Sequence, residues 1–406
     1  MLWPYITLAL LAGVLAGTFT GLIPGVHTNL IAIILLGFSS FLLSKFNPLV
    51  LVVFIVSMGL THTFIDYLPS IFLGAPDEDT ALSILPGHEM LNQGRAYEAV
   101  FLTLIGSFAA VFLTLILSPI FIYTLPKAYP YIQNIIPFIL IIASFFLIYF
   151  EKKNWYLALI IFLLAGFLGL SSLNLPVQQP LLPLLTGLFG ASSLILSVLK
   201  KQKIPKQKIF SIKTMKKTLK NKSILKALFA SLIASPLCCI LPGLSSSQAA
   251  VIGSEVTGDL NRKEFLILLG SINTMIIGLS FITLYSLQKA RTGAAIAIQQ
   301  ILPELSLSNL GIILLTIIIT GTISLFLTLF LAKIFSKKIT KIKYTKLSSL
   351  ILIFLSIVVI FFSGWIGFII FIISTSLGLT CIFLRVKRIQ LMGALLIPTI
   401  LFYLLI

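Results

Sequence analysis

The stretch TGLIPGVHTNLIA, residues 20–32, interrupts an apolar run with a proline, a glycine, a histidine and an asparagine between Pro24 and Asn29. A second stretch, CILPGLSSSQAAV at residues 239–251, repeats the Pro-Gly step and again places small polar residues after it. Proline removes a backbone donor, and glycine reaches backbone angles that other residues avoid. Each pair therefore predicts the end of one half-helix and the start of another.

Polar side chains follow both breaks, where the second half-helix would begin. Unpaired backbone in lipid costs several kcal/mol per group, so such a break is tolerated only inside protein or beside water. A helix N-terminus carries about +0.5 of a charge, which suits a carboxylate or a phosphate. Two facing N-termini would form an anion site, whereas the alternative is a pair of kinks that only help helices to pack. The predicted site residues are Pro24, Gly25, His27, Thr28, Asn29, Pro242, Gly243, Ser245, Ser246, Ser247 and Gln248.

The composition predicts a membrane protein. Of 406 residues, 58% are hydrophobic and 10% charged, whereas soluble domains are about 25% charged. We expect an all-α, multi-pass protein of the cell membrane with about 10–12 transmembrane or re-entrant helices of about 20 residues each. Apolar segments lie at about 5–36, 48–73, 98–125, 131–150, 155–172, 181–199, 227–257, 265–287, 307–332, 347–362, 365–384 and 389–405.

The formal net charge of +18 is concentrated in a few segments between apolar runs, chiefly residues 200–226, 333–346 and 385–388. Basic loops mark the cytoplasmic side of membrane proteins, so we expect no nucleic-acid partner. If all three segments are cytoplasmic, an even number of crossings separates each from the next. This predicts a re-entrant hairpin at residues 227–257 and two crossings between residues 346 and 385.

The lysine-rich segment divides the chain nearly in half. We predict an N-terminal membrane repeat at residues 1–199, a basic cytoplasmic loop at 200–226 and a C-terminal membrane repeat at 227–406. Each half opens with a segment broken by Pro-Gly. Inverted repeats with interrupted helices at matching positions are typical of secondary transporters, whose binding sites lie at the interruptions.

The segment GLTHTFIDYLPS, residues 59–70, places two ionisable residues in an apolar run. His62 and Asp66 are four residues apart and share one face of a helix. Ionisable residues within a membrane segment indicate function, so we predict that this pair binds the coupling proton or sodium ion. The alternative is a position at the membrane interface, since Pro69 and Gly74 follow closely.

An acidic run, Asp77-Glu78-Asp79, follows Pro76. Acids are favourable in the first turn of a helix, and carboxylates at a turn also suit hard cations. We interpret most of this run as a solvated loop and keep Asp77 as a candidate for ion coupling. Asn273, in a later apolar segment, is predicted to face the cavity.

The sequence contains no metal-binding or nucleotide-binding spacing that we recognise. We expect no cofactor and no metal centre, with Na⁺ present only as a coupling ion, and we do not expect an enzyme. The three cysteines are interpreted as small apolar residues; they are Cys238, Cys239 and Cys381. An intramembrane enzyme remains an alternative, and it would use His27, His62 or His88 with Asp66 or Asp79.

Three stretches carry a family resemblance: GTFTGLIPGVHTNLIA, FLGAPDEDTALSILPGHEMLNQGRAYEAV and LPGLSSSQAAVIGSE. They resemble the large membrane permease of tripartite tricarboxylate transporters, the TctA-like family. A Gly-x-x-x-Gly-x-x-Pro-Gly motif matches residues 17–25, a longer motif matches residues 76–96, and a second Pro-Gly motif falls at 242–243. The chain is shorter than is usual in that family and looks like a compact, archaeal-type branch.

The resemblance implies secondary import of carboxylates driven by a cation gradient, with a small membrane subunit and an extracytoplasmic substrate-binding protein. We therefore predict a secondary active transporter of a small organic anion, a carboxylate, coupled to Na⁺ or H⁺. We also expect contact with membrane lipid and a homo-oligomer. The alternative cargo is a polyprenyl phosphate, a lipid carrier flipped across the bilayer, whose phosphate would occupy the same anion site.

Overall fold

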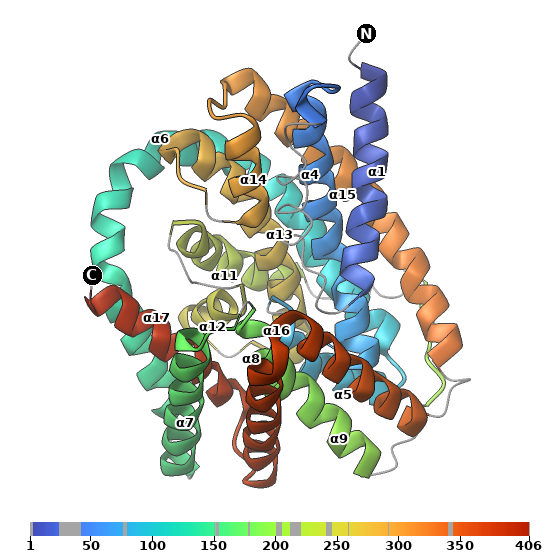
Figure 1. Ribbon diagram of the computed structural model, residues 1–406, viewed down its shortest axis with the longest axis vertical. Helices are drawn as coiled ribbons and strands as arrows, with labels where there is room; N and C mark the ends of the chain where they lie inside the picture. Colours follow the sequence, from blue (N-terminus) through green and yellow to red (C-terminus); the bar gives the residue numbers. More distant parts are fainter. Residues whose placement is uncertain are drawn as a thin grey trace.

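The computed structural model describes residues 3–23, 42–75, 79–149, 151, 154–177, 179–199, 205–211, 221–240, 246–258, 260–290, 292–339 and 344–405. Within these ranges the chain is helical and contains no strand. The described residues hold eight helices that are long and apolar enough to span a membrane, together with three shorter apolar helices. The predicted all-α, polytopic fold is confirmed (Figure 1).

The helices follow one another along the chain with short connections. The first half contains α1 (Trp3–Leu22), α4 (Pro48–Ile65), η1 (Pro69–Leu73), η2 (Ala81–Ser83), α5 (Ile84–Asn92), α6 (Ala96–Tyr149), α7 (Trp155–Asn174), α8 (Leu181–Leu185), η4 (Thr186–Ala191) and α9 (Ser192–Leu199). The second half contains α11 (Asn221–Ile240), α12 (Ser246–Thr257), α13 (Arg262–Leu287), α14 (Gly293–Ile301), α15 (Leu307–Lys338), α16 (Tyr344–Phe383), η6 (Arg388–Met392) and α17 (Gly393–Leu405).

Helix α6 differs from its prediction, because the segments expected at 98–125 and 131–150 form one helix. Four prolines lie inside it, at positions 119, 126, 130 and 137. Each proline removes a backbone hydrogen bond and favours a bend rather than a break when neighbours support the helix. Figure 1 shows α6 curving around one side of the molecule.

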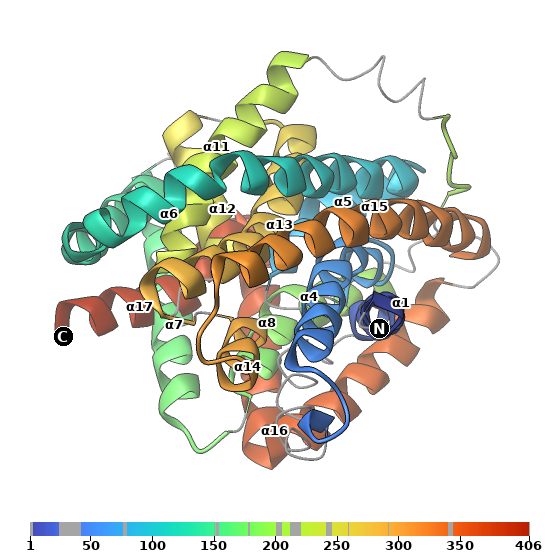
Figure 2. The same cartoon turned by 90° about the horizontal axis from the view of Figure 1, so that it is seen from above.

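Helices α6 and α13 form the closely packed centre of the fold (Figure 2). Glycines allow their backbones to approach, because a Cβ atom at Gly106 would lie 2.0 Å from the carbonyl oxygen of Ile267. A Cβ atom at Gly270 would likewise lie 2.0 Å from the carbonyl oxygen of Thr103. Small residues at helix contacts are the usual means of close packing in membranes.

Replacing Gly270 by alanine is expected to lower the free energy of unfolding by about 1–3 kcal/mol, because the added methyl group must push the α6 backbone away. Gly311→Ala in α15 is the matched control, since no atom lies within 4 Å of its Cβ position. Thermal unfolding of the two variants in the same detergent measures the difference. Equal melting temperatures would contradict the close contact between α6 and α13.

Helix α11 runs parallel to α13. The hydroxyl groups of Ser231 and Ser271 are 2.7 Å apart, and Cys239 Sγ lies 3.5 Å from the carbonyl oxygen of Ile276. Later residues of α11 therefore contact later residues of α13. Both helices begin at the same end of the molecule.

Helix α12 returns the chain beside α11. The Cα of Gly253 in α12 packs against Ala230 and Ala234 of α11, which lie well before the end of that helix. The chain leaves α12 at Thr257 and begins α13 at Arg262. Helices α11 and α12 thus lie side by side within residues 227–257, and the re-entrant character predicted for this segment stays a prediction; residues 241–245 lie outside the described residues.

The end of α4 contacts α13, since Thr63 lies beside Thr274 and Asp66, the C-cap residue of α4, contacts Asn273. Helix α1 runs parallel to α4, with Gly17 packed against Met58. The inverted repeat and the division at 1–199, 200–226 and 227–406 stay predictions.

Helix α16 changes direction at Gly364, whose φ of 65° and ψ of −168° are not helical. The positive φ is readily adopted by glycine, which lacks a Cβ atom. The two parts correspond to the segments predicted at 347–362 and 365–384. Figure 1 shows the sharp bend between them.

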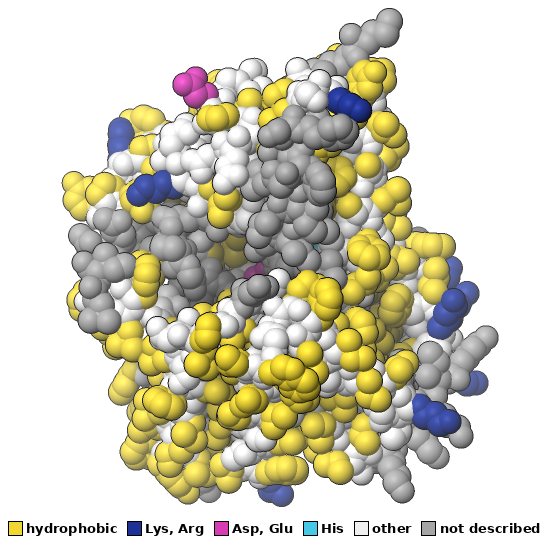
Figure 3. All heavy atoms as spheres, viewed as in Figure 1, with side chains coloured by type: hydrophobic (Ala, Val, Ile, Leu, Met, Phe, Trp, Pro, Cys, Tyr) yellow, Lys and Arg dark blue, Asp and Glu magenta, His cyan; other side chains and the backbone are white. Residues whose placement is uncertain are grey.

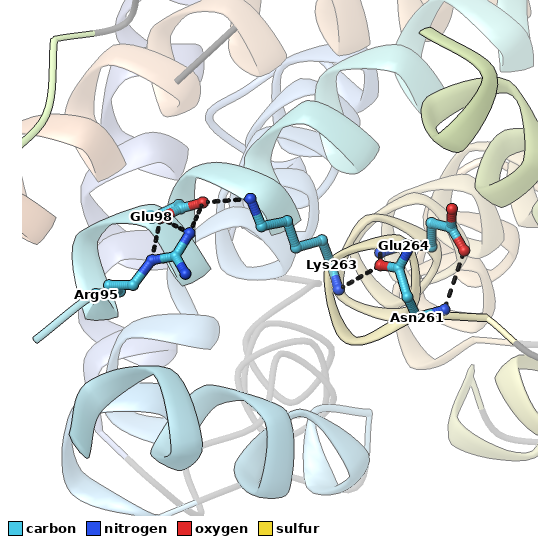
Figure 4. Close-up of polar contacts among 5 residues, drawn as sticks. All are labelled: Arg95, Glu98, Asn261, Lys263 and Glu264. Carbon is cyan, nitrogen blue, oxygen red and sulfur yellow. Dashed lines mark hydrogen bonds and ion pairs between the residues drawn. The ribbon is translucent and has the colours of Figure 1, made fainter. Parts of the chain in front are cut away.

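A buried acid joins α6 to α13 at the end where both helices begin (Figure 4). Glu98, only 4% exposed, accepts two hydrogen bonds of 2.7 Å from the Arg95 guanidinium. Its Oε1 also lies 2.9 Å from Lys263 Nζ. The carboxylate thus balances one basic side chain just before α6 and one in α13.

The described part of the basic loop lies at this same end. Gln207 donates to the carbonyl oxygen of Leu91 at 2.9 Å and accepts from the amide of Ala96 at 3.0 Å. The amide of Lys208 donates to the carbonyl oxygen of Gly94 at 2.8 Å. Apolar side chains cover much of the remaining surface, as expected for a protein surrounded by lipid (Figure 3).

Candidate functional site

The end of α4 carries the two ionisable side chains predicted for ion coupling, with His62 in its last turn and Asp66 as its C-cap residue. His62 is 4% exposed and Asp66 is 2% exposed, because α4 packs among α1, α13 and α15. Both side chains are therefore enclosed by protein, and the choice between a coupling site and a position at the membrane interface stays a prediction. Buried ionisable groups are costly unless they have partners, so their contacts define the site.

The imidazole of His62 contacts the last turn of α1. Its Nδ1 lies 3.0 Å from the hydroxyl oxygen of Thr20. Thr20 is two residues before the end of α1 at Leu22, immediately ahead of the first Pro-Gly break. The first break therefore begins beside the predicted coupling residues.

The carboxylate of Asp66 contacts the second half of the chain. Asn273 of α13 donates from Nδ2 to Asp66 Oδ2 at 2.8 Å, and Asn273 is 3% exposed. One turn earlier in α4, the Thr63 hydroxyl lies 3.2 Å from that of Thr274. Asn273 is therefore buried against Asp66, and the cavity that it was expected to face stays a prediction.

A second carboxylate lies at the start of α12. Asp79 Oδ1 accepts a 2.6 Å hydrogen bond from the hydroxyl of Ser246, and its backbone oxygen accepts at 3.1 Å from the same hydroxyl. The Ser247 hydroxyl lies 3.5 Å from that backbone oxygen. Negative charge is stabilised at a helix N-terminus. Asp79 is a partly exposed turn residue whose carboxylate contacts the start of a distant helix.

Hydroxyl groups connect Asp79 to Asp66. The Thr80 hydroxyl lies 2.6 Å from that of Ser70, which donates to the backbone oxygen of Asp66 at 3.0 Å. The fully buried Tyr67 lies close enough to Asp66 and Asp79 to interact with both charges. We call this set the polar cluster; it comprises Thr20, His62, Thr63, Asp66, Tyr67, Ser70, Asp79, Thr80, Ser246, Ser247, Asn273 and Thr274.

The polar cluster thus joins the residues that flank both Pro-Gly breaks, Thr20 before the first and Ser246 after the second. Several predicted residues cannot be compared, because they lie outside the described residues. These are Pro24, Gly25, His27, Thr28, Asn29, Asp77, Pro242, Gly243 and Ser245, together with the side chain of Gln248. Thr20, Ser70 and Thr80 could not be predicted as site residues, because isolated hydroxyl residues in apolar segments are common.

The polar cluster offers oxygen ligands rather than a transition-metal site. Within the described ranges, no group of three or more His, Cys, Asp and Glu side chains could hold a metal ion. The three cysteines are buried and none of them forms a disulfide. The carboxylate of Asp66 and the hydroxyls of Thr63 and Thr274 are oxygen donors, the type that hard cations such as Na⁺ prefer.

Residues 7–393 match the Tripartite tricarboxylate transporter TctA family. The chain belongs to this family. It is also similar to an uncharacterized protein, MJ1079, of Methanocaldococcus jannaschii, with 31% identity over 412 residues and 98% of each chain covered. No solved structure matches the chain.

Membership of the TctA family, together with the eight candidate spans, establishes a multi-pass protein of the cell membrane. The family is one of tricarboxylate-type transporters and belongs to tripartite transport systems. Its match to most of the chain agrees with the resemblance in the two Pro-Gly segments and the acidic segment.

Proposed function

We propose that this chain is the permease of a secondary active transporter that moves a small organic anion, a carboxylate, coupled to Na⁺ or H⁺. The proposal rests on the polar cluster. In this cluster, Thr20 before the first break and Ser246 after the second break lie near the buried carboxylate of Asp66 and the partly buried carboxylate of Asp79. Interrupted helices that meet at polar groups are the usual substrate sites of secondary transporters. The proposed partners are a small membrane subunit and an extracytoplasmic binding protein.

The two parts of the cluster have different roles in this proposal. The amide groups at the start of α12 and the hydroxyls of Ser246 and Ser247 bind a substrate carboxylate. Asp66 binds the coupling ion, because its carboxylate is buried among hydroxyl and amide groups. The His62 imidazole positions the last turn of α1 through its contact with the Thr20 hydroxyl.

Ligand binding by the purified chain tests the cargo class without requiring the partner proteins. We expect citrate or a smaller carboxylate to raise the melting temperature, by the equivalent of about 2.7 kcal/mol at 100 times its Kd. Sodium and pH are varied independently to identify the ion that strengthens binding.

Polyprenyl phosphate is tested in parallel as the alternative cargo. Stabilisation by the lipid phosphate, with no effect of any carboxylate at any sodium concentration or pH, would overturn the proposal. Uptake by proteoliposomes, with the sodium gradient or the proton gradient collapsed in turn, then tests secondary transport itself.

A further inference from the structure

Tyr67 lies in the polar cluster, between the end of α4 at Ile65 and the π-helix η1 that begins at Pro69. Proline has no backbone N–H, so it removes one of the hydrogen bonds that would continue α4. A π-helical turn inside a helical segment is often found at a functional site. Regular α-helical geometry therefore ends where the chain passes the polar cluster, and Tyr67 is placed at that point.

The side chain of Tyr67 is fully buried, with 0% exposed. Its hydroxyl has no hydrogen-bond partner among the described residues. Asn273 lies close enough to interact with this hydroxyl, but its amide donates to Asp66 Oδ2 at 2.8 Å. A buried hydroxyl without a partner is costly, and the hydroxyl of a buried tyrosine usually has one. The Tyr67 hydroxyl therefore favours a partner that binds in the polar cluster.

The N-terminus of α12 lies on the same side of the cluster. The Tyr67 hydroxyl interacts with the charges of both Asp66 and Asp79. Asp79 Oδ1 in turn lies 2.6 Å from the Ser246 hydroxyl and 3.4 Å from the Ser246 amide nitrogen, at the first residue of α12. A helix N-terminus attracts anions, and Tyr67 adds a buried side-chain donor near it.

The two acids determine when an anion can bind there. Both Asp66 and Asp79 repel a carboxylate while they are charged. In the proposed function the coupling ion neutralises Asp66, and the substrate displaces Asp79 from the start of α12. The incoming carboxylate then finds the amide and hydroxyl of Ser246 together with the hydroxyl of Tyr67. Hydrogen bonds to a charged carboxylate are stronger than those between neutral groups.

We propose that the Tyr67 hydroxyl donates a hydrogen bond to the carboxylate of the substrate, a role that rests on the proposed function. Tyr67 thereby supplies a substrate-binding group from the first half of the chain, whereas Ser246 and Ser247 supply theirs from the second. The same carboxylate contacts both halves of the cluster. Tyr67 acts on the substrate, whereas its neighbour Asp66 acts on the coupling ion.

The test compares the full-length wild type with Tyr67→Phe by calorimetric titration. Citrate and succinate are the probes, at the sodium concentration and pH that give the tightest binding to the wild type. We expect the Kd of the variant to rise at least about tenfold, because a hydrogen bond to a charged group is lost. The melting temperature without ligand should be equal or higher, because the substitution removes a buried hydroxyl that has no described partner.

Tyr97→Phe is the matched control, since it removes the same atom from another buried tyrosine, in α6 and outside the polar cluster. It should bind both probes like the wild type. A wild-type Kd for Tyr67→Phe would overturn the role of Tyr67 and leave the proposed function intact. Weaker binding that only accompanies a lower melting temperature would likewise overturn it, because a structural role explains both changes.

Titration at several sodium concentrations and pH values separates the substrate from the coupling ion. The increase in Kd should persist when the coupling ion is saturating. An increase that disappears at saturating ion would assign Tyr67 to the ion and overturn its role in substrate binding. If the wild type itself binds no carboxylate under any of these conditions, the proposed function is overturned together with the role of Tyr67.

Discussion

Asp66→Asn is expected to abolish accumulation of substrate against its gradient, with the uphill rate falling by about 100-fold, the effect of about 3 kcal/mol of lost coupling. Asparagine has the shape of aspartate, and its side-chain oxygen can still accept the 2.8 Å hydrogen bond from Asn273. The substitution therefore removes the charge and the titratable group while retaining the contact. Substrate exchange across the membrane, which needs no net movement of the coupling ion, should continue.

Uphill uptake and exchange are both measured in proteoliposomes prepared from the full chain and the partner proteins that it requires. Glu304→Gln is a matched acid-to-amide control, in the connection between α14 and α15 and far along the chain from the polar cluster. It should transport at the wild-type rate. Accumulation by Asp66→Asn at the wild-type level would exclude Asp66 as the coupling residue.

The breaks and the membrane-spanning character could be predicted because they depend on local chemistry. Proline and glycine interrupt a helix wherever they occur in this pattern, and long apolar segments require lipid or a protein interior. The pair of His62 and Asp66 could also be found, since two ionisable residues within an apolar helix need partners. Their spacing could not show that the partners are Thr20 and Asn273.

The contact of Asp79 with Ser246 could not be predicted, because the two residues are 167 positions apart. An acidic run after a proline has the same sequence pattern whether its carboxylates cap their own helix or another one. Arg388 was interpreted only as part of a cytoplasmic basic segment. Its burial depends on carbonyl groups of a π-helix in the first half of the chain, a feature that sequence patterns do not reveal.

Asp79→Ala is expected to strengthen substrate binding while weakening the fold. In the structure, the Asp79 carboxylate occupies the N-terminus of α12, where we propose that a substrate carboxylate binds. The apparent affinity for the substrate is the intrinsic affinity multiplied by the fraction of molecules whose site is free, so a site occupied by Asp79 binds substrate more weakly. If the site is free about one tenth of the time, removing Asp79 lowers the Kd of the substrate about tenfold.

The same substitution removes the carboxylate that accepts from Ser246, and loss of such a cap costs about 0.5–2 kcal/mol of stability. The melting temperature without ligand should therefore fall while the affinity rises, two changes of opposite sign.

Asp79→Asn separates charge from hydrogen bonding, because the amide oxygen still accepts from the Ser246 hydroxyl but carries no charge. This variant should give an intermediate Kd with a smaller loss of stability. A purely structural Asp79 predicts the reverse: weaker binding in Asp79→Ala, in step with its lower melting temperature. Calorimetric titration of the wild type and both variants with the same carboxylate distinguishes the two roles, because only competition for the α12 N-terminus makes a less stable protein bind more tightly.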